Sequence, residues 1–352
     1  MRVLGIETSC DETAAAVVEN GHALLSNVVA SSMDLHAQYG GVVPEIAARS
    51  HIEVILPVVQ QALNDAKCKW EDIDAIAVTY GAGLGGSLLV GVMTARTLAI
   101  AHNKPLYGIN HVEAHVYANF LTETALPGLV MPASQPLFPM LAIIVSGGHS
   151  QLVLFQDHFD YKLLGQTQDD AIGEAFDKVA KILGLPYPGG PSVAAAAQHG
   201  NPLAFQLPKA KMGKYDFSFS GPKTAVLRLA QAQIGESYDF PSTKLPERLS
   251  EAQKADIAAS FQRVAIETIV EKAKLAYEEF DPKSVVVAGG VAANQELRHQ
   301  LSTALPLPIE YPDSQLCTDN GAMVATLGCF KAQFNQAVAD PYRLEISPNL
   351  SM

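Results

Sequence analysis

Two histidines four residues apart are the strongest chemical signal in this chain. They lie in His111-Val-Glu-Ala-His115, directly after the apolar stretch 104–110. On a helix, side chains at this spacing share one face with Cβ atoms about 6 Å apart, so one metal ion could accept both imidazoles. The apolar stretch predicts a strand, and strand-to-helix turns of open α/β sheets commonly form ligand sites. The pattern predicts a metal site, with a helix-capping His and a packed His as the alternative.

A metal site needs a third ligand, and Asp319 in the segment Cys-Thr-Asp-Asn-Gly of residues 317–321 offers a carboxylate. Two imidazoles and one carboxylate leave coordination positions open for a substrate. The alternative is that Asp319 only caps the following apolar helix. Glu113 is not adjacent to the first His, as it would be in the H-E-x-x-H motif of metalloproteases. This argues against peptide hydrolysis.

Two polar turns that follow apolar strands have the composition of phosphate-binding loops. The first, residues 7–13, is Glu-Thr-Ser-Cys-Asp-Glu-Thr, and the second, residues 146–150, is Ser-Gly-Gly-His-Ser. Glycines let backbone N–H groups approach phosphate oxygens, and hydroxyls add hydrogen bonds. Either loop alone could be an ordinary tight turn. Together they predict a phosphate clamp.

Further positions could hold a nucleoside. Asn294 ends a Gly-Gly turn between an apolar strand and a helix, where it could bind a base or ribose or simply cap the helix. Asp177 lies on an acidic helical face, and the turn Pro-Gly-Gly-Pro of residues 188–191 follows it. Its glycines could admit a flat ribose or base. A solvated acidic face with a simple turn is the alternative.

The acidic pair Asp11 and Glu12 offers a general base. The preceding Cys10 is a poor nucleophile, because adjacent carboxylates disfavour its thiolate and no basic residue is near it in the sequence.

The chain is acidic, with a formal net charge of −12, which opposes unaided binding to a nucleic-acid backbone. One loop, residues 208–224, is the exception. It interleaves lysines with aromatic residues, a mixture typical of surfaces that hold phosphates and unstacked bases. We therefore predict an RNA contact there, against the alternative of a solvated loop that buries its aromatic residues. The lysines are Lys209, Lys211, Lys214 and Lys223.

Length and composition indicate a globular protein of about two domains, since the 352 residues are 48 % hydrophobic. No segment approaches the about 18 consecutive apolar residues of a membrane span, and the N-terminus has no signal-peptide pattern. We expect a cytoplasmic protein with no membrane association. The four cysteines form no C-x-x-C pair and no regular framework, which is typical of reduced thiols.

Short β-branched runs alternate with helical patterns along the chain, which predicts an α/β fold. A unit of three strands joined by turns occurs twice. The predicted strands are 3–6, 14–18 and 23–30 in the first copy, and 141–145, 152–155 and 161–164 in the second. Further strands are expected at 76–79 and 285–288. Two copies of one unit predict two similarly folded domains facing a cleft, with the Pro-rich loop 126–139 as the linker.

Taken together, these motifs resemble the TsaD family of tRNA adenosine threonylcarbamoyltransferases, once called glycoproteases. The resemblance runs in order from residue 1 to about residue 330. It rests on residues 1–13 (MRVLGIETSCDET), 36–45 (HAQYGGVVPE), 111–115 (HVEAH), 145–149 (VSGGH), 173–178 (GEAFDK), 187–191 (YPGGP), 216–221 (DFSFSG), 288–294 (AGGVAAN) and 318–321 (TDNG).

The resemblance implies two ribonuclease-H-like domains of the actin/hexokinase/Hsp70 (ASKHA) superfold. We expect residues 1–108 to form the first, with residues 331–352 packing back on it, and residues 109–330 to form the second with the metal ligands. The implied reaction transfers the threonylcarbamoyl group of threonylcarbamoyl-AMP to the 6-amino group of the adenosine 3′ of the anticodon, in tRNAs that read codons beginning with A.

The resemblance also implies roles for individual residues. His111, His115 and Asp319 match the ligands of one divalent ion, with Fe²⁺ favoured over Zn²⁺. Asp11 and Glu12 match acidic positions important for activity. The substrate contacts implied are Val145, Ser146, Gly147, Gly148 and His149 near the phosphate and carbamoyl groups, and Asp177, Gly190 and Asn294 at the adenosine, where ATP or AMP could also bind.

Implied partners are tRNA, a paralogous TsaB-like subunit, a small TsaE-like ATPase and a TsaC-like synthase that supplies threonylcarbamoyl-AMP. The chain departs from the family pattern at Ala82, where the family usually has Pro, and at Ala114, where it often has Gly. The family often has an acidic residue soon after the Gly-Gly-Pro turn, and residues 192–197 contain none. Two other classes of protein remain as alternatives, a metalloprotease and a catalytically silent ATP-binding scaffold. The scaffold would be expected to lack the metal ligands, which this chain keeps.

Overall fold

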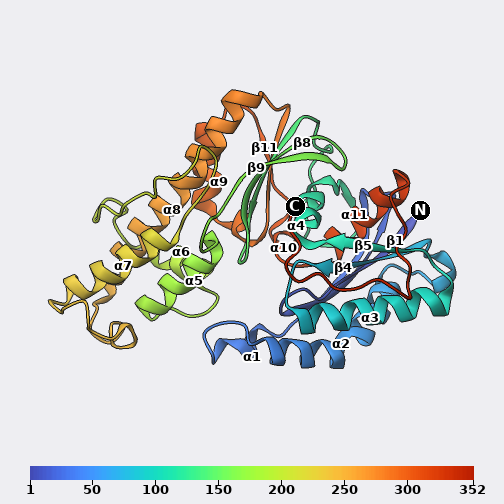
Figure 1. Ribbon diagram of the computed structural model, residues 1–352, viewed down its shortest axis with the longest axis horizontal. Helices are drawn as coiled ribbons and strands as arrows, with labels where there is room; N and C mark the ends of the chain where they lie inside the picture. The colour runs from blue at the N-terminus through green and yellow to red at the C-terminus, as the bar shows by residue number, and fades with distance from the viewer. The chain divides into compact units, whose positions relative to one another are not determined.

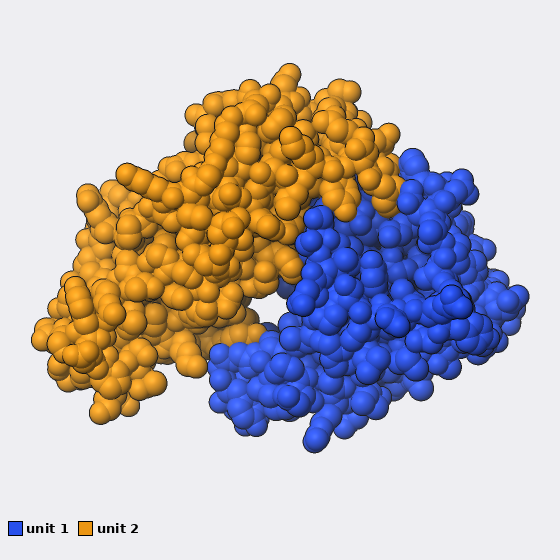
Figure 2. Space-filling view, in the orientation of Figure 1, with its two compact units in different colours: residues 1–136, 310–352 blue, residues 137–309 orange.

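The computed structural model describes residues 1–352 and divides into two compact units. Unit 1 contains residues 1–136 and 310–352, and unit 2 contains residues 137–309 (Figure 2). Each unit is built around one β-sheet with helices packed against it (Figure 1). The predicted α/β class is therefore confirmed.

The sheet of unit 1 has the order β5-β4-β1-β2-β3-β6. Strands β1, β2 and β3 form an antiparallel meander, while β4 and β5 extend it in parallel from β1. The predicted first meander and the strand at 76–79 are confirmed. The bounds are β1 (Arg2–Glu7), β2 (Glu12–Glu19), β3 (Ala23–Ser31), β4 (Ala75–Gly81), β5 (Leu106–Asn110) and β6 (Glu123–Thr124).

Helices cover both faces of this sheet. The side chains of Leu4 and Ile6 point into a core with α2 (Pro44–Asp65) and α3 (Gly85–His102). On β1, Gly5 lies against α11 (Gly321–Gln333), which also contacts α4 (His111–Tyr117). Because both faces are covered, the central strands β1 and β2 are almost entirely buried. The short elements of this unit are α1 (Met33–Ala37), η1 (Trp70–Asp72), η2 (Ala118–Phe120) and α10 (Ser314–Cys317).

The C-terminal segment that follows α11 lies along α3, β4 and β5. Ala339 forms an isolated bridge with Leu106, and Ser347 N donates a 2.7 Å hydrogen bond to the carbonyl of Tyr80. These contacts tie residues 339–351 to the strands that precede the histidine helix.

Unit 2 contains the second meander. Its sheet has the order β11-β10-β7-β8-β9, in which β7 to β9 are antiparallel and β10 is parallel to β7. The predicted strands at 141–145, 152–155, 161–164 and 285–288 are confirmed. The bounds are β7 (Met140–Val145), β8 (Ser150–Asp157), β9 (Asp160–Gln166), β10 (Ser284–Ala288) and β11 (Ile309–Glu310).

The longest helix of unit 2, α8 (Glu251–Phe280), begins with a capping box in which Ser250 and Gln253 satisfy each other's backbone N–H groups. It packs against α6 (Gly189–Ala197), α7 (Ser220–Gln233) and α9 (Gln295–Ala304). The remaining elements are α5 (Ile172–Leu183), η3 (Ser242–Lys244) and η4 (Gly290–Ala293). No helix of the chain combines the length and apolar character needed to cross a bilayer.

The bounds of the two units differ from the predicted domains 1–108 and 109–330. The division lies between residues 136 and 137, within the Pro-rich loop, and again between 309 and 310. Residues 109–136 and 310–330 belong to unit 1 because β5 pairs with β4 and α11 packs on β1 and β2. The expected metal ligands therefore all lie in unit 1.

Candidate metal centre and surrounding polar groups

The histidine helix α4 begins at His111 because Asn110, the last residue of β5, caps it. The side chain of Asn110 accepts a 2.9 Å hydrogen bond from Val112 N. Neither histidine is the cap, so that alternative is wrong. One turn apart, the imidazole rings of His111 and His115 lie with centroids 4.7 Å apart. Both side chains are buried.

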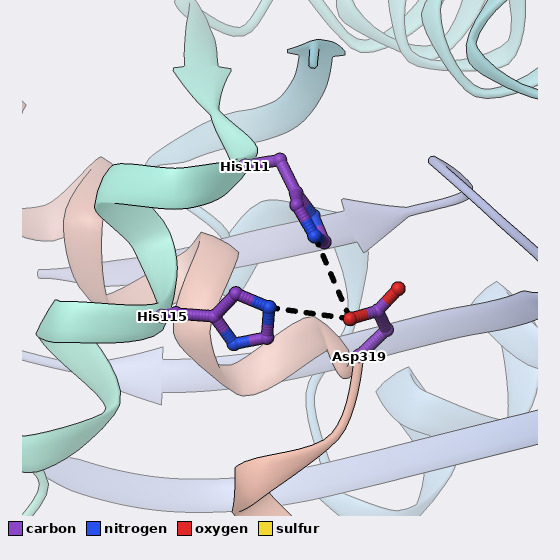
Figure 3. Close-up of side chains that lie close together, drawn as sticks. All are labelled: His111, His115 and Asp319. Atoms are coloured by element: carbon purple, nitrogen blue, oxygen red, sulfur yellow. Dashed lines mark ion pairs between the residues drawn. The ribbon is translucent and has the colours of Figure 1, made fainter. Parts of the chain in front are cut away.

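Asp319 completes a three-residue cluster. Its Oδ1 lies 3.6 Å from His111 Nε2 and 3.3 Å from His115 Nε2, and the three side chains converge (Figure 3). The potential ligand atoms all lie within 4.8 Å of one another. Asn320, and not Asp319, caps α11 by accepting a 3.0 Å hydrogen bond from Met323 N. The alternative in which Asp319 is only a helix cap is therefore wrong.

The chemistry of this cluster fits a divalent ion. Two imidazoles and one carboxylate are ligands that zinc and iron accept in proteins. The ring of His115 is 3 % exposed, and neither of its nitrogens has a hydrogen-bond partner. Unpartnered polar atoms in a protein interior are costly. An ion beside Nε2 would remove that cost at one nitrogen, so the three residues could hold a metal.

Two carboxylates surround His111. Burial by itself would lower the pKa of this imidazole, but the charges of Asp319 and Glu7 and a hydrogen bond with Glu7 raise it to about 9. Burial would conversely raise the pKa of Glu7, yet His111 and Thr79 hold it below its ordinary value. Without metal, this part of the site is thus a buried carboxylate–imidazolium pair, and its negative groups favour a cation.

The acidic turn between β1 and β2 lies in the same unit. Burial and the charges of Asp319 and Asp11 raise the pKa of Glu12 to about 9, so Glu12 holds a proton at neutral pH. Burial and the same negative charges also raise the pKa of the Cys10 thiol. This agrees with the expectation that Cys10 is not a nucleophile.

Two buried histidines hold this turn in place. His51 Nε2 donates a 3.0 Å hydrogen bond to the carbonyl of Cys10, and Ser32 Oγ donates a 2.8 Å hydrogen bond to the carbonyl of Asp11. His36 contacts the same Ser32 hydroxyl at 3.1 Å. The backbone that carries the acidic pair is therefore held by hydrogen bonds from His51 and Ser32.

In unit 2, two hydrogen bonds between Ser146 and His149 close the Val145–His149 loop. Ser146 N donates to the carbonyl of His149 at 2.8 Å, and His149 N donates to Ser146 Oγ at 3.1 Å. A Cβ added to Gly147 or Gly148 would meet nothing within 4 Å. The two glycines thus leave open space above the loop, as a backbone that approaches a ligand requires.

The residues expected at an adenosine are also in unit 2. Asp177 Oδ1 accepts a 2.7 Å hydrogen bond from Gly189 N at the start of α6, and open space lies beside Gly190. Asn294 caps α9 by accepting from Leu297 N, while its amide donates to Gln262. The helix-cap interpretation of Asn294 is therefore correct. Its contact with a nucleoside stays a prediction.

Most lysines of the 208–224 loop are paired with acids. Lys209 contacts Glu267 and Glu271, Lys214 contacts Glu279, and Lys223 contacts Asp170. Lys211 is exposed and forms no ion pair. The aromatic residues of the loop, Tyr215, Phe217 and Phe219, are buried. They cannot stack on unpaired bases in this conformation, so only the lysines remain as candidate tRNA contacts.

Comparison with known proteins identifies the family. The model of the TsaD family, tRNA N6-adenosine threonylcarbamoyltransferase, matches residues 23–326. The chain belongs to this family. It is 51 % identical over 341 residues to the tRNA N6-adenosine threonylcarbamoyltransferase of Thermomicrobium roseum, covering 95 % of this chain and 92 % of that protein. The Desulfitobacterium hafniense enzyme of the same name is 48 % identical over 100 % of this chain and 98 % of its own length.

Solved structures support the fold. Component A of the Acidaminococcus fermentans (R)-2-hydroxyglutaryl-CoA dehydratase aligns with a TM-score of 0.50 at 16 % identity, over 94 % of this chain and 98 % of that chain. Full-length HypF aligns with a TM-score of 0.54 at 12 % identity, over 96 % of this chain and 47 % of its own. The predicted ASKHA-type fold is confirmed.

This TsaD-family protein is a transferase that forms threonylcarbamoyladenosine in tRNA, as the motifs predicted. Nothing in the comparisons supports a metalloprotease or a silent scaffold. Sequence reasoning missed the contact between Glu7 and His111, although Glu7 stood in a motif that it singled out. The only signal was an acidic residue at the end of a buried strand.

Proposed function

We propose that His111, His115 and Asp319 hold one divalent ion, Fe²⁺ or Zn²⁺, and that this TsaD-family transferase binds threonylcarbamoyl-AMP through it. The observation that supports this most is the convergence of three ligand atoms within 4.8 Å. When bound, the ion would polarise the carbonyl of the threonylcarbamoyl group. The ligand set leaves coordination positions for that oxygen.

Asp11 and Glu12 are proposed to act on the attacking amine. The 6-amino nitrogen of adenosine forms a bond to the carbamoyl carbon, and the bond from that carbon to the phosphate oxygen breaks to release AMP. The amine must lose one proton, and the Asp11 carboxylate is our candidate acceptor. Glu12 is protonated at neutral pH, which suits a hydrogen-bond donor better than a base. The raised pKa of Glu12 supports our choice of Asp11 as the base.

Nucleotide contacts are proposed for unit 2. Backbone N–H groups of the Val145–His149 loop would bind near the phosphate and carbamoyl groups, since its glycines leave open space. Asp177, Gly190 and Asn294 would hold the adenosine. ATP or AMP could occupy the same positions.

Partners are proposed on the basis of family membership and charge. A net charge of −12 makes unaided tRNA binding unfavourable. This supports a need for a TsaB-like subunit and a TsaE-like ATPase, with threonylcarbamoyl-AMP supplied by a TsaC-like synthase. The 208–224 loop, through Lys209, Lys211, Lys214 and Lys223, is our candidate tRNA contact. A tRNA substrate of this kind supports a cytoplasmic location.

The proposed function is tested by supplying threonylcarbamoyl-AMP and unmodified tRNA to the purified protein with its partner proteins. Mass spectrometry of the tRNA nucleosides then measures threonylcarbamoyladenosine. We expect product from wild type and from His22→Ala, whose ring contacts only the backbone of Asn20. His111→Ala and His115→Ala should form none. Equal product from all four proteins would refute the proposed site.

A further inference from the structure

Glu7 is a buried carboxylate at the end of β1 with no route to solvent. Its side chain is 0 % exposed. Oε1 accepts a 2.5 Å hydrogen bond from Ser9 N, and Oε2 accepts a 2.5 Å hydrogen bond from the hydroxyl of Thr79. A carboxylate held by one donor from the turn after β1 and one from β4 has little freedom to move. Its position is therefore set by the sheet.

The same Oε2 atom faces the first metal-site histidine. It lies 3.4 Å from His111 Nδ1, and the hydroxyl of Ser9 lies 3.0 Å from that nitrogen. The opposite nitrogen, Nε2, faces Asp319. With Nδ1–H donating to these oxygens, Nε2 is the nitrogen that would give up its proton and point its lone pair toward a metal in the cluster. Glu7 and Ser9 thus select both the ring orientation and the tautomer that a metal ligand needs.

The second histidine has no such support. His115 Nδ1 is buried and has no hydrogen-bond partner. The two imidazoles are therefore unequal, because the sheet fixes only His111. Loss of the Glu7 carboxylate would leave both imidazole rings without a carboxylate that accepts a hydrogen bond from them and so orients them.

We propose that Glu7 is a positioning residue that orients His111 and thereby sets the metal affinity of the site. This inference rests on the proposed metal site and adds a residue to it. Metal-binding histidines commonly donate their second N–H to a carboxylate, and loss of that carboxylate typically weakens metal binding about 10- to 100-fold. Thr79 acts one step further away, by holding the carboxylate in place.

The test compares Zn²⁺ affinity, measured by competition with a chromophoric chelator, and the absorption spectrum of bound Co²⁺. Glu7→Gln should weaken Zn²⁺ binding about 10- to 100-fold and shift the Co²⁺ bands. Thr79→Val should cause a smaller weakening. Glu113→Gln is the matched control, since Glu113 is also a buried carboxyl near the site but has no hydrogen bond with either imidazole. It should leave both readings unchanged.

The outcomes separate the inference from the proposed function. If wild type binds neither ion, the metal site itself fails and Glu7 has no role toward it. If wild type binds and Glu7→Gln matches it in affinity and spectrum, the Glu7 inference alone is overturned. Circular dichroism shows whether Glu7→Gln folds. If it does not, Thr79→Val decides, and wild-type affinity in that variant would overturn the inference.

Discussion

Gly5 in β1 and Gly321 in α11 approach so closely that a Cβ on Gly5 would lie 2.4 Å from the carbonyl oxygen of Gly321. The contact is tight on the other side as well, because a Cβ on Gly321 would lie 2.5 Å from Ala16 N. Asp319 lies two residues before Gly321, and the helix cap Asn320 lies between them. Close packing of α11 on the sheet therefore sets where the Asp319 carboxylate, the proposed metal ligand, lies.

Gly5→Ala should displace α11 and with it Asp319. Overpacking of this kind typically costs about 1–3 kcal/mol of unfolding free energy, and here the nearest atoms are backbone, which cannot rotate away. We expect a lower midpoint of urea unfolding together with weaker Zn²⁺ binding. Gly221→Ala is the control, because nothing lies within 4 Å of its Cβ. Wild-type Zn²⁺ affinity in Gly5→Ala would show that α11 does not position the ligand.

The strands of both meanders follow from local sequence. In the first, Asn20 and Gly21 have φ values of 55° and 77°, the left-handed conformation that a tight hairpin turn requires. Asn-Gly between two apolar runs is the strongest short-range signal for such a hairpin. These elements could be predicted because residues within a few positions of one another determine them.

Contacts between distant segments could not be predicted in the same way. The place of α11 in unit 1 depends on glycines that allow close approach to β1, which no local pattern reveals. The candidate ligands His111, His115 and Asp319 could be singled out because donor type and spacing indicate them. Glu7 was not, since its contact with His111 joins the end of β1 to the first residue of α4, far apart in the sequence. The acids that pair with Lys209 and Lys214 lie on α8, also far from these lysines in the sequence.

Glu12 should make stability depend on pH in the metal-free protein. Its ordinary pKa of 4.5 applies to the unfolded chain, whereas the folded value is about 9. Between these values the folded state holds a proton that the unfolded state has lost, so wild type loses stability as pH rises. Glu12→Gln removes this penalty. Its melting temperature should exceed that of wild type increasingly from pH 5 to pH 9, and a constant difference would contradict the protonated Glu12.

Asp11→Asn should impair chemistry more than Glu12→Gln. Removing a general base typically lowers the rate about 10²- to 10⁴-fold, and an amide cannot accept the proton. Glutamine keeps the donor that a protonated Glu12 would supply. Single-turnover formation of threonylcarbamoyladenosine measures both rates with substrate saturating. If Glu12→Gln formed threonylcarbamoyladenosine more slowly than Asp11→Asn, Glu12 and not Asp11 would be the base.

The 208–224 loop predicts a specific order of effects on tRNA binding. Lys211 has no ion pair, whereas Glu279 compensates the charge of Lys214. Lys211→Glu should therefore weaken tRNA association more than Lys214→Glu, and both should affect threonylcarbamoyl-AMP binding less. Loss of one phosphate contact lowers the salt dependence of log K by about 1. Lys283→Glu, an exposed lysine outside the loop, is the control. Equal loss of tRNA and nucleotide binding would argue against this contact.

The central claim is that a divalent ion held by His111, His115 and Asp319 is required for threonylcarbamoyl transfer. It is tested most directly by removing metal with a chelator, adding back Fe²⁺ or Zn²⁺, and measuring bound metal and product in the same samples. We predict that wild type loses activity and regains it in proportion to metal, at one ion per chain. Asp319→Asn should regain neither. Full activity in metal-free wild type, or metal bound equally well by Asp319→Asn, would contradict the account.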